Sequence, residues 1–164
     1  MLRMSARCWA AVSLPLHRVS PQPMTTNLKP PSELKSLIVE DDFTSRLLLQ
    51  TFLARYGECH IATNGREAVT AFSTALASES PYHVICMDIL MPEMHGNEAM
   101  RQVREMEHAR GVFPGRGVKI IMTSGVKEVR QVFQSFDETC DAYLFKPIDT
   151  RKLVKELQAF GLLE

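Results

Sequence analysis

The sequence predicts an α/β protein in which helices cover both faces of a single doubly wound, five-stranded parallel sheet. Short, largely apolar runs recur along the chain, as expected for strands that are buried on both faces. The longer segments between them carry apolar residues three or four positions apart, which predicts amphipathic helices. The two patterns alternate five times without an internal repeat or a second domain, and this order is typical of one parallel sheet.

The first strand–helix unit is expected at residues 36–57. The run Ser-Leu-Ile-Val at 36–39 predicts a short buried strand, and three acids follow it directly. In the segment after the acids, Leu49 and Leu53 lie four positions apart, which places them on one side of a helix. Gly57 stands where such a helix should end.

The remaining four units repeat this pattern. Strands are expected at residues 59–62, 83–87, 118–122 and 142–145. Helices are expected at residues 63–77, 97–109, 126–136 and 149–160. In the first of these helices Ala68, Phe72 and Leu76 recur four positions apart, and the others show similar spacing. The Gly- and Pro-rich segment 111–117 predicts a loop.

Composition and charge exclude several classes of function. Of the 164 residues, 45% are hydrophobic and 23% are charged, which is typical of a water-soluble globular protein. The formal net charge is +0, so we expect neither a broad basic face for nucleic acid nor a membrane partner. The four cysteines lack the paired spacing of zinc or redox sites, and a reducing, cytoplasmic compartment is the simplest expectation.

Residues 1–33 differ from the rest of the chain. The segment contains basic residues, serines and prolines, and it has no acid before Glu33. Its apolar run at residues 8–16 is too short to span a bilayer. We expect a disordered tail or extension, with Met24 as a second candidate start, while an organelle transit peptide or a secretory signal stays open. Residues 34–164 are expected to form the domain.

Polar groups are concentrated where the expected strands end. Ligands of open parallel sheets bind beyond the carboxyl ends of the strands, near the switch point in strand order. The groups are Glu40, Asp41 and Asp42 after the first strand, Thr63 and Asn64 after the second, Asp88 after the third, Thr123 and Ser124 after the fourth, and Lys146 after the fifth. Carboxylates, hydroxyls and one ammonium group should therefore meet at one edge of the sheet.

This combination favours phosphoryl transfer to a carboxylate. Clustered carboxylates repel one another unless a cation or protons relieve them, and hard oxygen ligands suit Mg²⁺. A lysine and a hydroxyl would hold phosphate oxygens. Each group also has an ordinary explanation, since acids after a strand often cap a helix, as Asp42 is expected to do. Thr123 and Ser124 alone are as consistent with a plain turn as with a functional role, and a lysine before a proline is usually a surface residue.

Four motifs together resemble the response-regulator receiver domains of two-component signalling. They are LIVEDD, ICMDILMPEMHG, IIMTSG and AYLFKPID, and the resemblance covers residues 34–163. It implies a flavodoxin-like strand order of 2-1-3-4-5. The histidine that precedes Gly96 and the long loop before the fourth strand depart from the usual pattern of the family.

The resemblance also implies a role for each matching residue. Asp88 would be the phospho-acceptor, assisted by Thr123 and Lys146. Tyr143 would be the switch aromatic, and Pro147 would follow a cis peptide bond. The Mg²⁺ ligands would be Glu40, Asp41, Asp88 and the backbone carbonyl of Leu90.

The expected function is therefore a stand-alone receiver, a phosphorylation switch and not an enzyme with an external substrate. A histidine kinase or histidine phosphotransfer protein would be the donor, and the partner-binding face would comprise the fourth helix, fifth strand and fifth helix. We expect a monomer or weak dimer, and the output stays open between a chemotaxis-type switch and a phosphorelay. One alternative is an Mg²⁺-dependent aspartyl-phosphate hydrolase, although Leu90 stands where such enzymes carry a second acid. A degenerate receiver used only for docking is the other alternative.

Overall fold

The computed structural model describes residues 34–125 and 140–164 of the chain. The expected tail at residues 1–33 and the expected helix at residues 126–136 lie outside the described residues. No helix in the two described segments is long and apolar enough to cross a membrane.

All five strands form one parallel sheet in the order β2-β1-β3-β4-β5, which confirms the expected fold and strand order. The strands are β1 (Leu34–Val39), β2 (Gly57–Ala62), β3 (Val84–Asp88), β4 (Lys119–Gly125) and β5 (Ala142–Lys146). In the register of the sheet, Asp88 lies beside Thr123, and Gly125 lies beside Lys146. The carboxyl ends of β3, β4 and β5 therefore share one edge.

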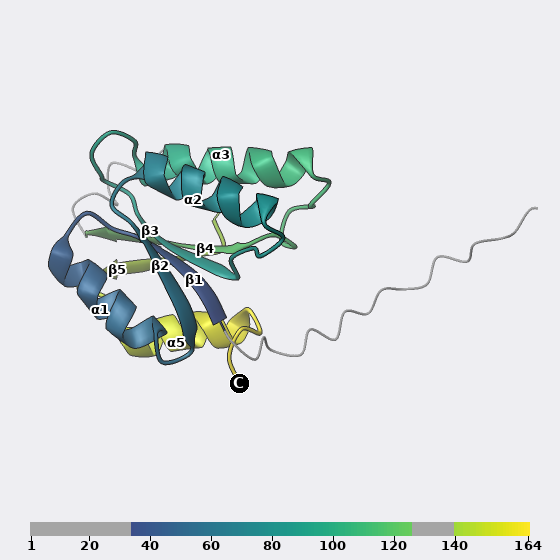
Figure 1. Cartoon of the computed structure of the whole chain (residues 1–164). Helices are drawn as coiled ribbons and strands as arrows, with labels where there is room; N and C mark the ends of the chain where they lie inside the picture. Colours follow the sequence, from purple (N-terminus) through teal and green to yellow (C-terminus); the bar gives the residue numbers. More distant parts are fainter. Residues whose placement is uncertain (1–33, 126–139) are drawn as a thin grey trace, which may run out of the picture.

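Four helices of the described segments cover the two faces of the sheet. They are α1 (Phe43–Leu53), α2 (Gly65–Ala77), α3 (Gly96–Ala109) and α5 (Thr150–Ala159). Helices α2 and α3 pack on one face, whereas α1 and α5 pack on the other (Figure 1). Successive strand residues alternate between the two cores, because Leu37 and Val39 join the first and Ile38 joins the second.

Short polar side chains begin three of these helices. Asp42, Asn64 and Asp149 each accept a hydrogen bond from a backbone N–H in the first turn of α1, α2 and α5, respectively. Such caps satisfy donors that have no partner within the helix. The expected capping role of Asp42 is therefore confirmed.

The first helix ends earlier than the sequence predicts. Helix α1 stops at Leu53, and Gly57 is the first residue of β2 instead of the end of the helix. A Cβ atom at Gly57 would collide with the backbone of Leu34 in the adjacent strand. The glycine is therefore needed for the close approach of two strands, a requirement that only the tertiary structure reveals.

Candidate functional site

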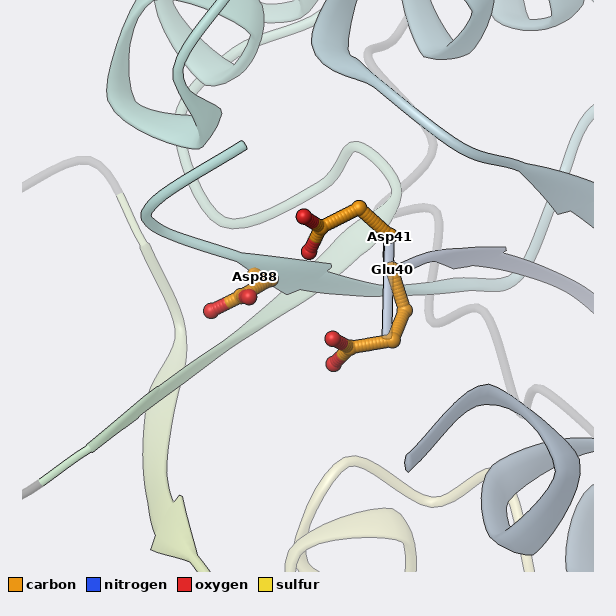
Figure 2. Close-up of side chains that lie close together, drawn as sticks. All are labelled: Glu40, Asp41 and Asp88. Carbon is orange, nitrogen blue, oxygen red and sulfur yellow. The ribbon is translucent and has the colours of Figure 1, made fainter. Parts of the chain in front are cut away.

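Three carboxylates meet at the carboxyl edge of the sheet. Glu40 and Asp41 follow β1, and Asp88 is the last residue of β3 (Figure 2). One oxygen from each carboxylate lies within 4.8 Å of the others. Parallel pairing of β1 with β3 produces this cluster, because it places the ends of the two strands side by side.

Lys146 joins two of these acids from the end of β5. Its Nζ atom lies 2.8 Å from Oε1 of Glu40 and 2.7 Å from Oδ2 of Asp88. Glu40 is fully buried and Asp88 is 5% exposed, so both carboxylates have lost most of their contact with water. Three carboxylates face one ammonium group, and the site therefore keeps an excess of negative charge.

The burial of these charges changes their protonation. Burial raises the pKa of Glu40 to about 7 and also raises the pKa of Asp88, although hydrogen bonds from Lys146 lower both. Burial lowers the pKa of Lys146, but its bonds to the two carboxylates outweigh that effect and leave it above the usual range. The lysine therefore stays charged at neutral pH, whereas Glu40 exchanges a proton there.

The backbone holds the acidic residues in place. The N–H of Ile89 donates to Oδ1 of Asp88 at 2.8 Å, and the N–H of Asp42 donates to Oε1 of Glu40 at 3.2 Å. Arg46 in α1 donates from Nη1 to the backbone carbonyls of Glu40 and Asp41, at 2.9 and 3.0 Å. Sequence reasoning missed Arg46, because no motif shows a side chain that reaches back to carbonyls of the preceding loop.

Two buried oxygen atoms at this edge have no hydrogen-bond partner in the described segments. They are Oε2 of Glu40 and Oγ1 of Thr123, and both residues are fully buried. A buried polar atom without a partner costs roughly 1–3 kcal/mol, so these atoms are expected to meet a ligand. A carboxylate oxygen suits a hard cation such as Mg²⁺, and a hydroxyl can donate to a phosphoryl oxygen. The residues present therefore fit both groups.

Of the other residues that the sequence predicts for the site, Leu90 lies on the surface and Tyr143 packs against the core. Leu90 follows Asp88 by two residues, and it is 45% exposed. Tyr143 lies on β5 opposite Met122 and packs against the core beneath α2 and α3. The peptide bond between Lys146 and Pro147 is cis, as expected.

Three of the polar residues that the sequence places at strand ends form hydrogen bonds with residues close to them in the chain. Thr63 bonds through its N–H and hydroxyl to Glu67, and Asn64 caps α2. The hydroxyl of Ser124 donates to the carbonyl of Gly125. Thr63 and Asn64 thus contribute to the start of α2.

Gly96 is a second residue whose importance the sequence did not reveal. Its N–H donates to the carbonyl of Ile89 at 2.9 Å, and a Cβ atom added here would collide with the backbone carbonyl of Asp88. The start of α3 therefore touches the backbone of the central acid. The only available signal was a glycine eight residues after that acid.

Gly96→Ala is expected to displace Asp88 and to lower the free energy of unfolding by about 1–3 kcal/mol, because a buried backbone must move. Chemical denaturation measures the stability, and the affinity for Mg²⁺ measures whether the carboxylates keep their positions. The control is Gly161→Ala, in which the positive φ of 71° strains the alanine but no atom lies within 4 Å of the added Cβ, so this variant should lose some stability without losing Mg²⁺ affinity. Unchanged Mg²⁺ affinity in a folded Gly96→Ala protein would show that the contact with Asp88 does not position the acid.

Comparison with known proteins gives a consistent result. A family model described as the response regulator receiver domain matches residues 36–158. The transcriptional regulatory protein SrrA of Staphylococcus aureus is 32% identical over 124 residues, which is 75% of this chain and 46% of SrrA. The chain therefore spans about half the length of this curated relative.

Solved structures show the same similarity. The co-crystal structure of the Saccharomyces cerevisiae histidine phosphotransfer protein Ypd1 with the receiver domain of Ssk1 matches with a TM-score of 0.63 and 29% identity, over 79% of this chain and 90% of that chain. The receiver domain of the Arabidopsis thaliana histidine kinase CKI1, complexed with Mg²⁺ and BeF₃⁻, matches with a TM-score of 0.61 and 29% identity, over 78% and 89%. The chain belongs to the response regulator receiver domain family.

Proposed function

We propose that this protein is a phosphorylation switch that accepts a phosphoryl group on Asp88 in the presence of Mg²⁺. The observation that carries the proposal is the convergence of Glu40, Asp41 and Asp88 with the ammonium group of Lys146 and the unpartnered hydroxyl of Thr123. Phosphoryl transfer needs mainly positioning and neutralisation of charge, and this set of groups supplies both.

In the proposed reaction a carboxylate oxygen of Asp88 attacks the phosphorus atom of a phosphohistidine. A new P–O bond forms, the P–N bond breaks, and the imidazole leaves with the electron pair and takes up a proton. Lys146 balances charge on the phosphoryl oxygens, and Thr123 donates a hydrogen bond to them. Mg²⁺ held by Glu40, Asp41, Asp88 and the carbonyl of Leu90 would neutralise the remaining negative charge.

The proposed donor is a histidine phosphotransfer protein or a histidine kinase. Exposed apolar side chains lie on α1 and just after Asp88, namely Phe43, Leu47, Leu48 and Leu90, with exposures of 66%, 49%, 41% and 45%. A donor must approach closely enough to bring its phosphohistidine to Asp88, and apolar contacts beside the acid would support that approach. The Ssk1 receiver was solved together with a histidine phosphotransfer protein, which supports this choice.

The proposed output is a change at the face that includes β5 and α5. Phosphorylation adds about two negative charges beside Lys146 and Thr123. Movement of Thr123 toward them would allow Tyr143 on the adjacent strand to change position, which shifts the population between two packings. The helix expected at residues 126–136 belongs to this proposed face, and it lies outside the described residues.

Several finer points stay predictions. These are action without an output domain, the monomeric or weakly dimeric state, and the absence of nucleic-acid and membrane partners. The assignment of residues 34–164 to the receiver and of 1–33 to a tail is also a prediction. A reducing, cytoplasmic location is supported by Cys59, Cys86 and Cys140, which are all free thiols. The hydrolase alternative gains no support, because Leu90 offers no acid beside Asp88.

The direct test is transfer of ³²P from a purified phosphohistidine protein in the presence of Mg²⁺. We expect up to one hydroxylamine-sensitive acyl phosphate per chain, and no transfer when EDTA removes the metal. Rapid turnover of a small phosphate ester would favour the hydrolase. The docking-only receiver would be favoured if the protein were not labelled and if its spectra did not respond to Mg²⁺ and beryllofluoride.

The affinity for Mg²⁺ is expected to fall as the pH decreases. The metal requires ionised carboxylates, and Glu40 has a pKa of about 7 in the metal-free site. Protons therefore compete with the metal below that pH, and the affinity should drop about tenfold between pH 8 and pH 6. Isothermal titration at constant ionic strength measures this change, and a pH-independent affinity would contradict it.

The phosphorylated form is expected to lose its phosphate slowly. Hydrolysis requires a water molecule held in line with the P–O bond, and the aliphatic side chain of Leu90 cannot bind such a water. Leu90→Asn should therefore speed hydrolysis by at least about tenfold in a ³²P chase. Leu47→Asn is the matched control, because Leu47 is a similarly exposed leucine on α1. A lifetime of only seconds in the unmodified protein would contradict the expectation.

A further inference from the structure

A second concave site lies at the opposite end of the sheet from Asp88. Its walls are the ends of α2 and α3, the loop before β4 and residues 160–162, near the C-terminus marked in Figure 1. Lys119 is the first residue of β4 and lines this site, whereas Thr123 of the same strand lies at the end of the sheet that carries Glu40, Asp41 and Asp88, here named the acidic edge. The cavity, here named the basal hollow, has a volume of about 650 Å³. Sites for small organic ligands commonly measure roughly 300–1,000 Å³.

The walls of the basal hollow are mainly apolar and aromatic. They include Phe72, Leu76, Tyr82, Phe160 and Leu162. The polar end of Tyr82 is already engaged, because its hydroxyl lies 2.6 Å from Nδ1 of His60, so its ring acts as part of the wall. Phe72 and Tyr82 are buried, whereas Leu76, Phe160 and Leu162 are half-buried, so an apolar ligand body would replace water against these three side chains without leaving a buried hydroxyl unpaired.

Two arginines give the basal hollow an uncompensated positive charge. Arg110 and Arg116 line it and form no ion pair with any residue of the described segments. Glu107 is the single acid among the lining residues, but its carboxylate is already engaged. Its Oε1 accepts from the N–H of Val118 at 2.6 Å, and its Oε2 accepts from Arg104 at 2.7 Å.

The other cationic and polar groups sharpen the preference for an anion. The ammonium group of Lys119 is paired with Asp141 at 2.9 Å, which leaves the charge of the two arginines as the excess. Nδ1 of His83 accepts from the N–H of Lys35 at 2.8 Å, so the neutral ring carries its hydrogen on Nε2. The lining therefore supplies cations and a donor, whereas its single carboxylate is already paired.

We propose that the basal hollow binds a small amphipathic organic acid. The apolar body of the ligand would lie against Leu76, Phe160 and Leu162, and its single anionic group would pair with Arg110 and Arg116. A neutral compound of the same shape would gain the apolar contacts but not the charge-assisted hydrogen bonds. The inference does not depend on phosphorylation of Asp88, because the two sites share no residue.

The test compares two probes of similar shape on the full-length protein. One is 8-anilinonaphthalene-1-sulfonate, which is anionic, and the other is N-phenyl-1-naphthylamine, which is neutral. We expect one molecule of the sulfonate probe to bind per chain. The double variant Arg110→Ala/Arg116→Ala should weaken the affinity for this probe at least about tenfold. The affinity for the neutral probe should change less than about twofold. Arg55→Ala/Arg101→Ala is the matched control, because it removes the same charge from exposed positions outside the basal hollow.

The location of the probe is tested separately. Amide chemical shifts in ¹⁵N spectra should change at residues of the basal hollow and not at α1 or the acidic edge. Val112→Trp, which places a large ring on a half-buried wall residue, should block binding without unfolding the protein. The proposal would be overturned if the affinity for the sulfonate probe did not change in Arg110→Ala/Arg116→Ala, or if the chemical-shift changes were confined to α1. The proposal would also be overturned if the sulfonate probe did not bind and if Val112→Trp changed the amide chemical shifts of residues 1–33. That result would identify the chain's own N-terminal segment as the occupant of the basal hollow.

Discussion

Asp88→Asn is expected to abolish phosphoryl labelling, both from a phosphohistidine donor and from acetyl phosphate. The carboxamide has nearly the same shape, but it cannot act as the nucleophile that forms the acyl phosphate. The loss should be at least about a thousandfold in rate, because removal of a nucleophile eliminates the covalent step itself. Labelling with ³²P followed by hydroxylamine treatment measures the acyl phosphate, and peptide mass spectrometry locates it.

The matched control for this result is Asp42→Asn. Asp42 lies close to the same site in sequence, but its side chain caps α1 through the N–H of Ser45, and asparagine caps a helix equally well. The control protein should therefore label normally. Persistent labelling at residue 88 in the Asp88→Asn protein, or loss of labelling in the control, would refute the assigned acceptor. Because Asp88 is buried with a raised pKa, the neutral variant is expected to stay folded.

Much of the fold and of the acidic edge could be predicted, because both depend on patterns that are local in sequence. Apolar runs identify strands such as β3, and parallel topology places the ends of β1 and β3 at one edge. Asp88 was identifiable for this reason, since it ends a buried strand with a charge. The same reasoning named Lys146, although the two short bonds that it makes required coordinates.

The features that escaped prediction arise from contacts between distant segments. Gly57 and Gly96 are needed because backbone from another strand or loop lies where a Cβ atom would be. Arg46 binds carbonyl groups, and carbonyls carry no residue-specific signal. The basal hollow is formed by the ends of several elements, and no single stretch of sequence contains its pattern.

Lys146→Met is expected to destabilise the protein strongly at pH 8 without metal. The substitution leaves Glu40 and Asp88 buried beside each other without their shared ammonium group. Removing one partner of a buried ion pair typically costs about 3–5 kcal/mol, and the partial exposure of Lys146 places this case near 2–4 kcal/mol. Urea denaturation measures the loss, and Lys155→Met, at an exposed position of α5, is the control.

The destabilisation should depend on pH in a defined direction. The pKa of Glu40 is raised from 4.5 to about 7 in the folded protein, so the folded state binds its proton more tightly than the unfolded state. The resulting stability is fully present below pH 4.5 and is lost as the pH rises through 7. Loss of Lys146 removes a group that lowers this pKa, and the variant should therefore continue to lose stability up to a higher pH than the parent protein.

Mg²⁺ should reverse most of this loss, because a divalent cation can replace the missing ammonium charge between the carboxylates. A metal at a hundred times its dissociation constant stabilises the folded state by about 2.7 kcal/mol, which is comparable to the expected defect. The variant at pH 8 should therefore regain most of its stability in Mg²⁺ but not in an equal ionic strength of NaCl. Equal pH profiles for variant and parent, or no difference between the two salts, would show that Lys146 does not balance the charge of the acidic edge.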